Sequence, residues 1–230
     1  MEEARLGGFI PLSDATRRPR SVPFVTISII VVNAIVFALE LAGGDAFVNQ
    51  WMEVPADIIS GHHLITILTA MFMHAGWMHI IGNMVFLWAF GPEIEDAMGS
   101  VRYLAFYLLS GLAASAAQIA LSPHSTVPNL GASGAIAGVM GAFIVTYPRD
   151  RIRSVLIIGW FVSVRQIPSA LLIGFWFLIQ LFSQIGSVAD VQSGGGVAYM
   201  AHVGGFLFGA IAGRLFENSQ RVADSDNPEI

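Results

Sequence analysis

Long apolar segments constrain this chain more than any other feature of its sequence. Several of them approach or exceed the ~20 residues that a helix needs to cross a bilayer. Short stretches containing glycine, proline or arginine separate them. Charged residues make up only 12% of the 230 residues, about half the fraction found in a typical soluble domain. We therefore expect an all-α fold, a polytopic membrane protein built as a bundle of helices.

The sequence predicts six crossings, over residues 24–42, 78–98, 101–121, 133–147, 169–185 and 197–216. Residues 45–76 are apolar in patches but are interrupted by Pro55, Gly61 and two histidines, which favours short helices lying in the membrane interface. We expect two short tails around one six-helix membrane domain with an external interfacial loop and an external lid loop. These parts cover residues 1–22 and 218–230 (tails), 23–217 (membrane domain), 45–76 (interfacial loop) and 186–196 (lid loop).

The basic residues, all of them arginines, test this topology. With the N-terminus in the cytoplasm, six crossings place every arginine on the cytoplasmic side, and the external segments 45–76, 122–132 and 187–196 contain none. Since basic residues concentrate in cytoplasmic loops, we predict that the N- and C-termini are both cytoplasmic. We expect an integral membrane protein of a plasma membrane of the bacterial or archaeal type.

Two short stretches each place one reactive side chain at the start of an apolar segment. They are Gly131-Ala132-Ser133-Gly134 and Ala201-His202-Val203-Gly204-Gly205. Helical neighbours lie three and four residues apart, and the positions below each reactive residue on its face carry only small side chains: Ala137 and Gly141, and Gly205, Gly209 and Gly213. Small residues let two membrane helices approach closely. We therefore predict that Ser133 and His202 meet as nucleophile and base.

The helix expected to begin at Ser133 is too short to cover the bilayer. A helix over residues 133–147 would measure roughly 22 Å, against a hydrocarbon core of about 30 Å. Ser133 would then lie below the external surface, where free backbone groups are tolerated only inside protein or a water-filled cavity. The amides at this helix start would stabilise a developing oxyanion.

A second polar pair, His79 and Asn83, lies one helical turn apart at the external end of the second predicted span. Polar side chains at membrane depth usually face the interior of the bundle, and both of these can donate hydrogen bonds to an oxyanion. A metal site is the weaker interpretation, because the His-Glu-x-x-His pattern is missing and His74 is the only other ligand candidate nearby.

A purely structural role is open for each of these features taken alone. The Gly-x-Ser-Gly stretch is also typical of helix packing, and His79 and Asn83 are also compatible with a hydrogen bond between helices. His202 by itself would more often be a histidine of the core. Their common position at the external ends of their spans favours one site. No acidic residue lies at the same depth, so we expect a serine–histidine dyad.

The chain resembles the rhomboid family of intramembrane serine proteases over roughly residues 65–213. The motifs occur in the family's order and on the expected spans: His79-x-x-x-Asn83, Gly91-x-x-x-Glu95-x-x-x-Gly99, Gly131-x-Ser133-Gly134 and Ala201-His202-x-x-Gly205-x-x-x-Gly209. The resemblance implies a six-helix rhomboid-like bundle with a water-filled cavity open to the external side. It also implies Ser133 as nucleophile, His202 as general base and then acid, and an oxyanion hole formed by His79, Asn83 and the amides of Ala132 and Ser133. Glu95 would be structural.

The chain departs from the family's pattern at two places. Many members carry a Trp-Arg pair in the first external loop, whereas Trp51 is followed here by Met52, so this loop must be anchored differently. Members often place an aromatic residue one turn after the nucleophile, stacked on the base. That position is Ala137 here, and Tyr199 is our candidate for the support of His202.

From these features we expect a serine endopeptidase that hydrolyses single-pass transmembrane proteins near the external membrane boundary. Its partners would be those substrates and the lipid bilayer, with no nucleic acid, no cofactor and no metal. A catalytically inactive rhomboid-like protein that binds membrane helices is the alternative, although such proteins usually lack the serine or the histidine. A small transporter is a third possibility, but we find neither an inverted repeat nor charged residues inside the bundle.

Overall fold

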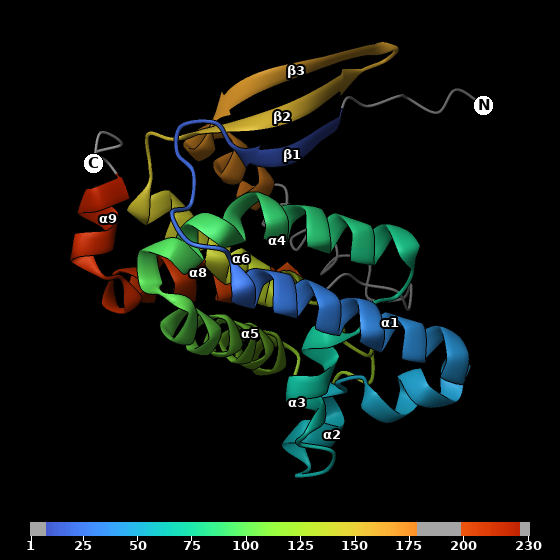
Figure 1. Cartoon of the computed structure of the whole chain (residues 1–230). Helices are drawn as coiled ribbons and strands as arrows, with labels where there is room; N and C mark the ends of the chain where they lie inside the picture. Colours follow the sequence, from blue (N-terminus) through green and yellow to red (C-terminus); the bar gives the residue numbers. More distant parts are fainter. Residues whose placement is uncertain (1–7, 179–198, 226–230) are drawn as a thin grey trace.

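The computed structural model describes residues 8–178 and 199–225, and helices make up most of this part of the chain (Figure 1). The lid loop 186–196 and the second half of the fifth predicted crossing lie outside the described residues. The helices are α1 (Phe24–Trp51), α2 (Pro55–Ile59), α3 (Thr66–Thr69), the 3-10 helix η1 (Ala70–Phe72), α4 (Trp77–Met98), α5 (Ser100–Leu121), α6 (Ser133–Thr146), the Ser169–Leu178 helix, α8 (Tyr199–Phe216) and α9 (Ser219–Ser225).

The predicted crossings coincide with helices wherever the structure describes them. By length and composition, α1 and α5 can each cross a membrane. The α3–η1 segment and α4 pass the same test together, although they are bent by 88° at the break between them. The α6 and Ser169–Leu178 helices are apolar but shorter. The described part of the chain therefore holds two or three clear spans, and the full set of six crossings remains a prediction.

The first helix breaks where the sequence predicts its end. Gly44 has φ 58° and ψ −153°, a backbone conformation that glycine adopts at little cost. A further helical segment then runs on to Trp51. Beyond it, the short helices α2, α3 and η1 follow one another, so the prediction of short helices in this region is confirmed.

The prediction of an all-α protein is wrong, because three strands form an antiparallel sheet in the order β1-β2-β3. β1 (Gly8–Asp14) comes from the N-terminal tail, and β2 (Arg151–Ile158) and β3 (Phe161–Pro168) form a hairpin. Two Cα pairs, Gly8 with Ile157 and Asp14 with Ile152, fix the register of β1 on β2. Part of the tail is thus ordered, and β1 packs against α4. The apolar residues between Arg149 and Arg165, too few for a crossing, lie along β2 and β3 instead.

Helix α6 occupies the centre of the molecule, in contact with α4, α5 and α8, and nearly all of its side chains are buried. Its contact with α8 brings backbone against backbone. A methyl group added at Gly205 or Gly209 would overlap the carbonyl groups of Gly134 and Gly138. Because neither helix carries side-chain bulk along this line, the two backbones touch.

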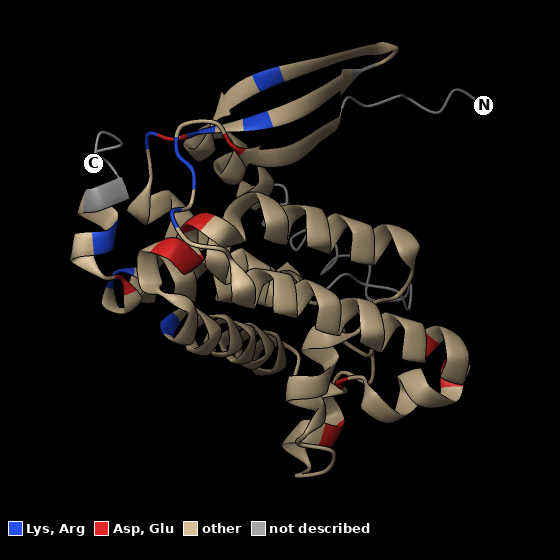
Figure 2. Cartoon of the chain, viewed as in Figure 1, with Lys and Arg blue, Asp and Glu red and all other residues tan. Residues whose placement is uncertain are grey.

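Most of the charged residues lie at the end of the bundle where α4 finishes (Figure 2). Among the described residues, the arginines lie at the end where α4 finishes and α9 packs, or on the sheet, while the middle of the helices carries no charge. Glu95 accepts hydrogen bonds from the backbone N–H groups of Val25 and Thr26, at 2.9 and 2.8 Å. It thus satisfies amide groups at the start of α1, as the structural role implied for it requires.

Candidate active site

Ser133 and His202 lie in contact between α6 and α8. The distance from His202 Nε2 to Ser133 Oγ is 2.6 Å. Ser133 is the first residue of α6 and His202 lies in the first turn of α8, so the parallel starts of the two helices bring the side chains together. His202 is 8% exposed. A hydroxyl and an imidazole at this distance have the geometry of a nucleophile and its base.

The turn before Ser133 is set by Gly131, whose φ of 135° is a conformation that other residues rarely adopt. Its N–H donates to the carbonyl of Ala70 at 2.8 Å. A Cβ added to Gly131 would lie 2.9 Å from His79 Cε1 and 3.5 Å from Ser133 Oγ. The absence of a side chain therefore lets the ring of His79 lie close to Ser133.

His79 is held in one tautomer by its own helix start. Its Nδ1 accepts a hydrogen bond from the N–H of Ala75 at 3.2 Å, so the proton of the neutral ring is on Nε2. This nitrogen would lie 3.1 Å from a Cβ at Gly131. The imidazole thus presents an N–H donor toward the turn that leads to the serine.

Asn83 follows His79 by one turn of α4 and is 8% exposed. Its Nδ2 is buried and has no hydrogen-bond partner among the described residues. Buried donors are rarely left unpaired unless they serve a function or meet a ligand. At the start of α6, the amides of Ala132 and Ser133 add donors of the kind that helix geometry leaves free.

Two aromatic rings flank His202. The ring of Trp176, on the Ser169–Leu178 helix, is centred 5.7 Å away at an angle of 45°. Tyr199, the residue expected to support the base, is centred 6.5 Å away, edge-on. We did not predict the contact with Trp176. Only its place in an apolar segment marks it in the sequence, and which partner it meets is decided by tertiary packing.

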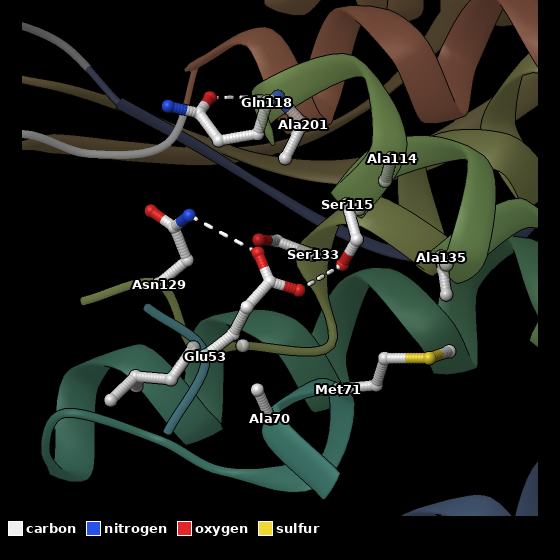
Figure 3. Close-up of a pocket in the computed structure, with 14 residues that line it drawn as sticks. Glu53, Ala70, Met71, Ala114, Ser115, Gln118, Asn129, Ser133, Ala135 and Ala201 are labelled. Carbon is white, nitrogen blue, oxygen red and sulfur yellow. Dashed lines mark hydrogen bonds between the residues drawn. The ribbon is translucent and has the colours of Figure 1, made fainter. Parts of the chain in front are cut away.

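A small cavity of about 40 Å³ adjoins the serine (Figure 3). Ser133, Gly131, Ala201 and the polar side chains of Glu53, Ser115, Gln118 and Asn129 line it. Among the described residues, no cluster of three or more histidine, aspartate or glutamate side chains is arranged to hold a metal ion. The larger water-filled cavity implied by the resemblance remains a prediction.

Together, the fold and the site define a class: a mostly helical membrane protein that pairs a serine with a histidine between two closely packed helices. A model of the Rhomboid domain matches residues 61–219 of the chain. This match covers more than half of the sequence, and the chain belongs to the rhomboid family.

Several curated relatives support this assignment. Rhomboid protease GluP of Bacillus subtilis (strain 168) is 30% identical over 161 residues, 69% of this chain and 31% of that protein. RHOMBOID-like protein 6, mitochondrial, of Arabidopsis thaliana is 30% identical over 156 residues, 68% of this chain and 45% of that protein. Rhomboid protein 1, mitochondrial, of Saccharomyces cerevisiae is 28% identical over 192 residues, 79% of this chain and 50% of that protein. The chain thus spans about a third to a half of the length of these relatives.

Proposed function

We propose that this protein is an intramembrane serine endopeptidase that hydrolyses peptide bonds of single-pass transmembrane proteins. The observation that carries the proposal is the 2.6 Å contact between His202 Nε2 and Ser133 Oγ. Membership of a family that includes a protein named as a protease supports it. The reaction class follows from the chemistry, because a serine hydroxyl paired with a neutral imidazole is an activated nucleophile.

In the proposed reaction, Ser133 Oγ attacks the scissile carbonyl carbon while His202 Nε2 takes the hydroxyl proton. The tetrahedral intermediate collapses as the imidazolium gives this proton to the leaving amine, which leaves an acyl-enzyme. A water molecule then attacks the ester, again with His202 as base, and releases the new carboxyl end and free Ser133.

The negative charge on the carbonyl oxygen needs donors that are already in place. We assign this role to His79 Nε2–H, Asn83 Nδ2 and the backbone N–H groups of Ala132 and Ser133. Two observations support the assignment: Asn83 Nδ2 has no hydrogen-bond partner in the described part of the chain, and the tautomer of His79 is fixed with its proton on Nε2.

The proposal includes six crossings with both termini in the cytoplasm. Apart from those on the sheet, the described arginines gather at one end of the bundle (Figure 2), which supports this orientation. Cleavage would then occur near the opposite, external boundary of the membrane, within a cavity open to water. The relatives include mitochondrial proteins as well as a bacterial one, so a plasma membrane of the bacterial or archaeal type is a proposal from the sequence alone.

Labelling with a fluorophosphonate probe tests the proposed dyad. The purified protein in detergent should be labelled at Ser133, and Ser133→Ala and His202→Ala should each abolish the label while the thermal unfolding midpoint stays close to that of the wild type. The same two variants should lose cleavage of a single-span substrate. A folded wild-type protein that takes no label and cleaves no substrate would instead support an inactive, helix-binding relative.

A further inference from the structure

Glu53 is a buried carboxylate in a short loop, where acidic side chains are usually exposed. It lies in the loop between α1 and α2, yet it is only 1% exposed. It precedes residues 61–219, which match the family model, so the match gives it no role. Burial raises the pKa of its carboxyl group, and hydrogen bonds from Ser115 and Asn129 oppose this shift. A buried carboxylate is costly unless its oxygens are paired, and here both oxygens are.

The side chain of Glu53 joins two other segments of the chain (Figure 3). Ser115 Oγ, on α5, donates to Glu53 Oε2 at 2.6 Å, and Asn129 Nδ2 donates to Glu53 Oε1 at 3.2 Å. Hydrogen bonds that involve an ionised group are stronger than neutral ones. The carboxylate therefore ties the first external loop to α5 and to the segment before α6.

The backbone of Glu53 repeats the link to Asn129. The two residues form an isolated antiparallel bridge, in which Glu53 N donates to Asn129 O at 3.1 Å and Asn129 N donates to Glu53 O at 2.7 Å. Asn129 is thus held by both its backbone and its side chain. Two residues further on, Gly131 is held by the carbonyl of Ala70.

These contacts fix the approach to the serine. The residues between Asn129 and Ser133 precede α6, and their backbone N–H groups take no part in its helical hydrogen bonds; Ala132 contributes only its carbonyl, which accepts from Ile136 N at 3.0 Å. Glu53 and Ser133 line the same small cavity (Figure 3), so no other layer of the protein separates the carboxylate from the turn. The backbone conformation of this turn sets the orientation of the Ser133 side chain, and with it whether the hydroxyl contacts His202.

We propose that Glu53 is a positioning residue, whose carboxylate acts through Asn129 and Ser115 to hold the 129–133 turn so that Ser133 faces His202. This inference rests on the proposed function. Glu53 is not the acid of a triad, because its side-chain hydrogen-bond partners in the described part of the chain are the hydroxyl of Ser115 and the amide of Asn129, not His202. In this proposal Glu53 sets the orientation of the Ser133 hydroxyl, so its loss should lower kcat more than it changes KM.

The test compares Glu53→Ala, Glu53→Gln and wild type as full-length proteins in detergent, with a single-span substrate and a fluorophosphonate probe. For Glu53→Ala we expect kcat and the labelling rate to fall by about 10- to 100-fold, since small misplacements of a reacting group cost this much. KM should stay within about twofold, because substrate binding is not affected. Glu53→Gln should retain most of kcat, since its amide oxygen still accepts from Asn129.

Asp57→Asn is the matched control. Asp57 is a carboxylate four residues further along, in α2, but it is exposed, so its loss should leave kcat, KM and the labelling rate at the wild-type values. A general effect of negative charge in this region would appear in both variants, and would overturn the proposal.

The outcomes separate this inference from the function on which it rests. Wild-type labelling together with a kcat of Glu53→Ala within about twofold of the wild-type value, or a change confined to KM, overturns the role of Glu53 alone. No labelling of the wild type overturns both. If Glu53→Ala does not fold, Ser115→Ala replaces it, because it removes one donor and leaves the carboxylate in place. An unchanged kcat in folded Ser115→Ala would overturn the proposal, and a fall in kcat at constant KM would support it.

Discussion

At the scale of single residues, the proposed site is marked by the hydrogen-bond donors of Asn83 and His79. The Nδ2 of Asn83 is buried without a partner among the described residues, and the tautomer of His79 leaves its Nε2–H directed at the turn before the serine. An unpaired buried donor is costly in the resting protein. In the proposed reaction this cost would be offset when the oxyanion forms beside the donor, as in a preorganised site.

Replacing one of these donors should therefore slow the reaction far more than it weakens substrate binding. For Asn83→Ala we expect kcat to fall by about 10²- to 10³-fold, the loss typical of one oxyanion donor, with a much smaller change in KM. Asn33→Ala is the control, since Asn33 is also buried but donates to the carbonyl of Ile29 within α1. Steady-state cleavage of a single-span substrate measures both. Equal losses of kcat in the two variants would contradict the assignment.

The structure also shows how the loop after α1 is anchored, which the sequence left open. The sequence lacks the Trp-Arg pair that anchors the first external loop in many rhomboids, and has Met52 after Trp51. In the structure, Thr69 Oγ1 donates to the carbonyl of Trp51 at 2.9 Å, and Glu53 ties the loop to Asn129. A single glutamate in a loop carries no sequence signal of burial, so its partners could not be predicted.

At the scale of elements, the pairing of α6 with α8 decides whether a site exists. The predicted strips of small residues do meet, and Gly209 lies against the carbonyl group of Gly138. A strip of glycines is a local pattern with helical spacing, so the sequence predicts it directly. Which helix packs against such a strip depends on contacts between residues far apart in the sequence. Here the second strip of small residues, on α8, was the evident partner for the strip on α6.

Adding one methyl group to this contact should separate the two helices. We expect Gly209→Ala to destabilise the protein by about 1–3 kcal/mol, as overpacking does in a close-packed interior, and to slow labelling of Ser133. Gly174→Ala is the matched control, because Gly174 lies in the Ser169–Leu178 helix with no atom within 4 Å of an added Cβ. That change should be neutral or slightly stabilising. Thermal unfolding in one detergent measures both, and similar midpoints for the two variants would contradict the contact.

The sheet is the element that the sequence pattern did not predict. The residues of β2 and β3 alternate only weakly, and the arginines in the hairpin, Arg151, Arg153 and Arg165, fit the cytoplasmic loop that we expected there. A hairpin of two strands is marginal by itself. The third strand comes from the N-terminal tail, far away in the sequence; it completes the sheet by pairing with β2 and also packs against α4.

At the scale of the whole molecule, the N-terminal strand is joined to the bundle by a cluster of charged groups. Arg17 forms an ion pair with Asp150 and stacks on the ring of Tyr147, at the end of α6. Asp14, at the end of β1, lies beside Asp150. Burial, together with the neighbouring Asp150, raises the pKa of Asp14 from 3.8 to about 7. The cluster connects the tail, the hairpin and α6.

This shift predicts how stability depends on pH. A carboxyl group whose pKa is raised by folding binds its proton more tightly in the folded protein, so its contribution is greatest at low pH and is lost as the pH rises. We expect the unfolding midpoint of the wild type to fall between pH 4 and about 7, the interval between the two pKa values. Asp14→Asn cannot ionise and should show a flatter profile over this interval. Parallel profiles for the two proteins would contradict the shift.

The sequence by itself determined the helical membrane class, the order of the motifs and the residues of the candidate site. These features are local or periodic: apolar length, glycine spacing, and polar residues placed at the ends of apolar runs. Only the tertiary structure decided that Trp176 flanks His202, that Glu53 is buried beside the serine, and that the tail joins a hairpin to form a sheet. Each of these depends on which surfaces meet across long stretches of chain, and no short-range pattern records that choice.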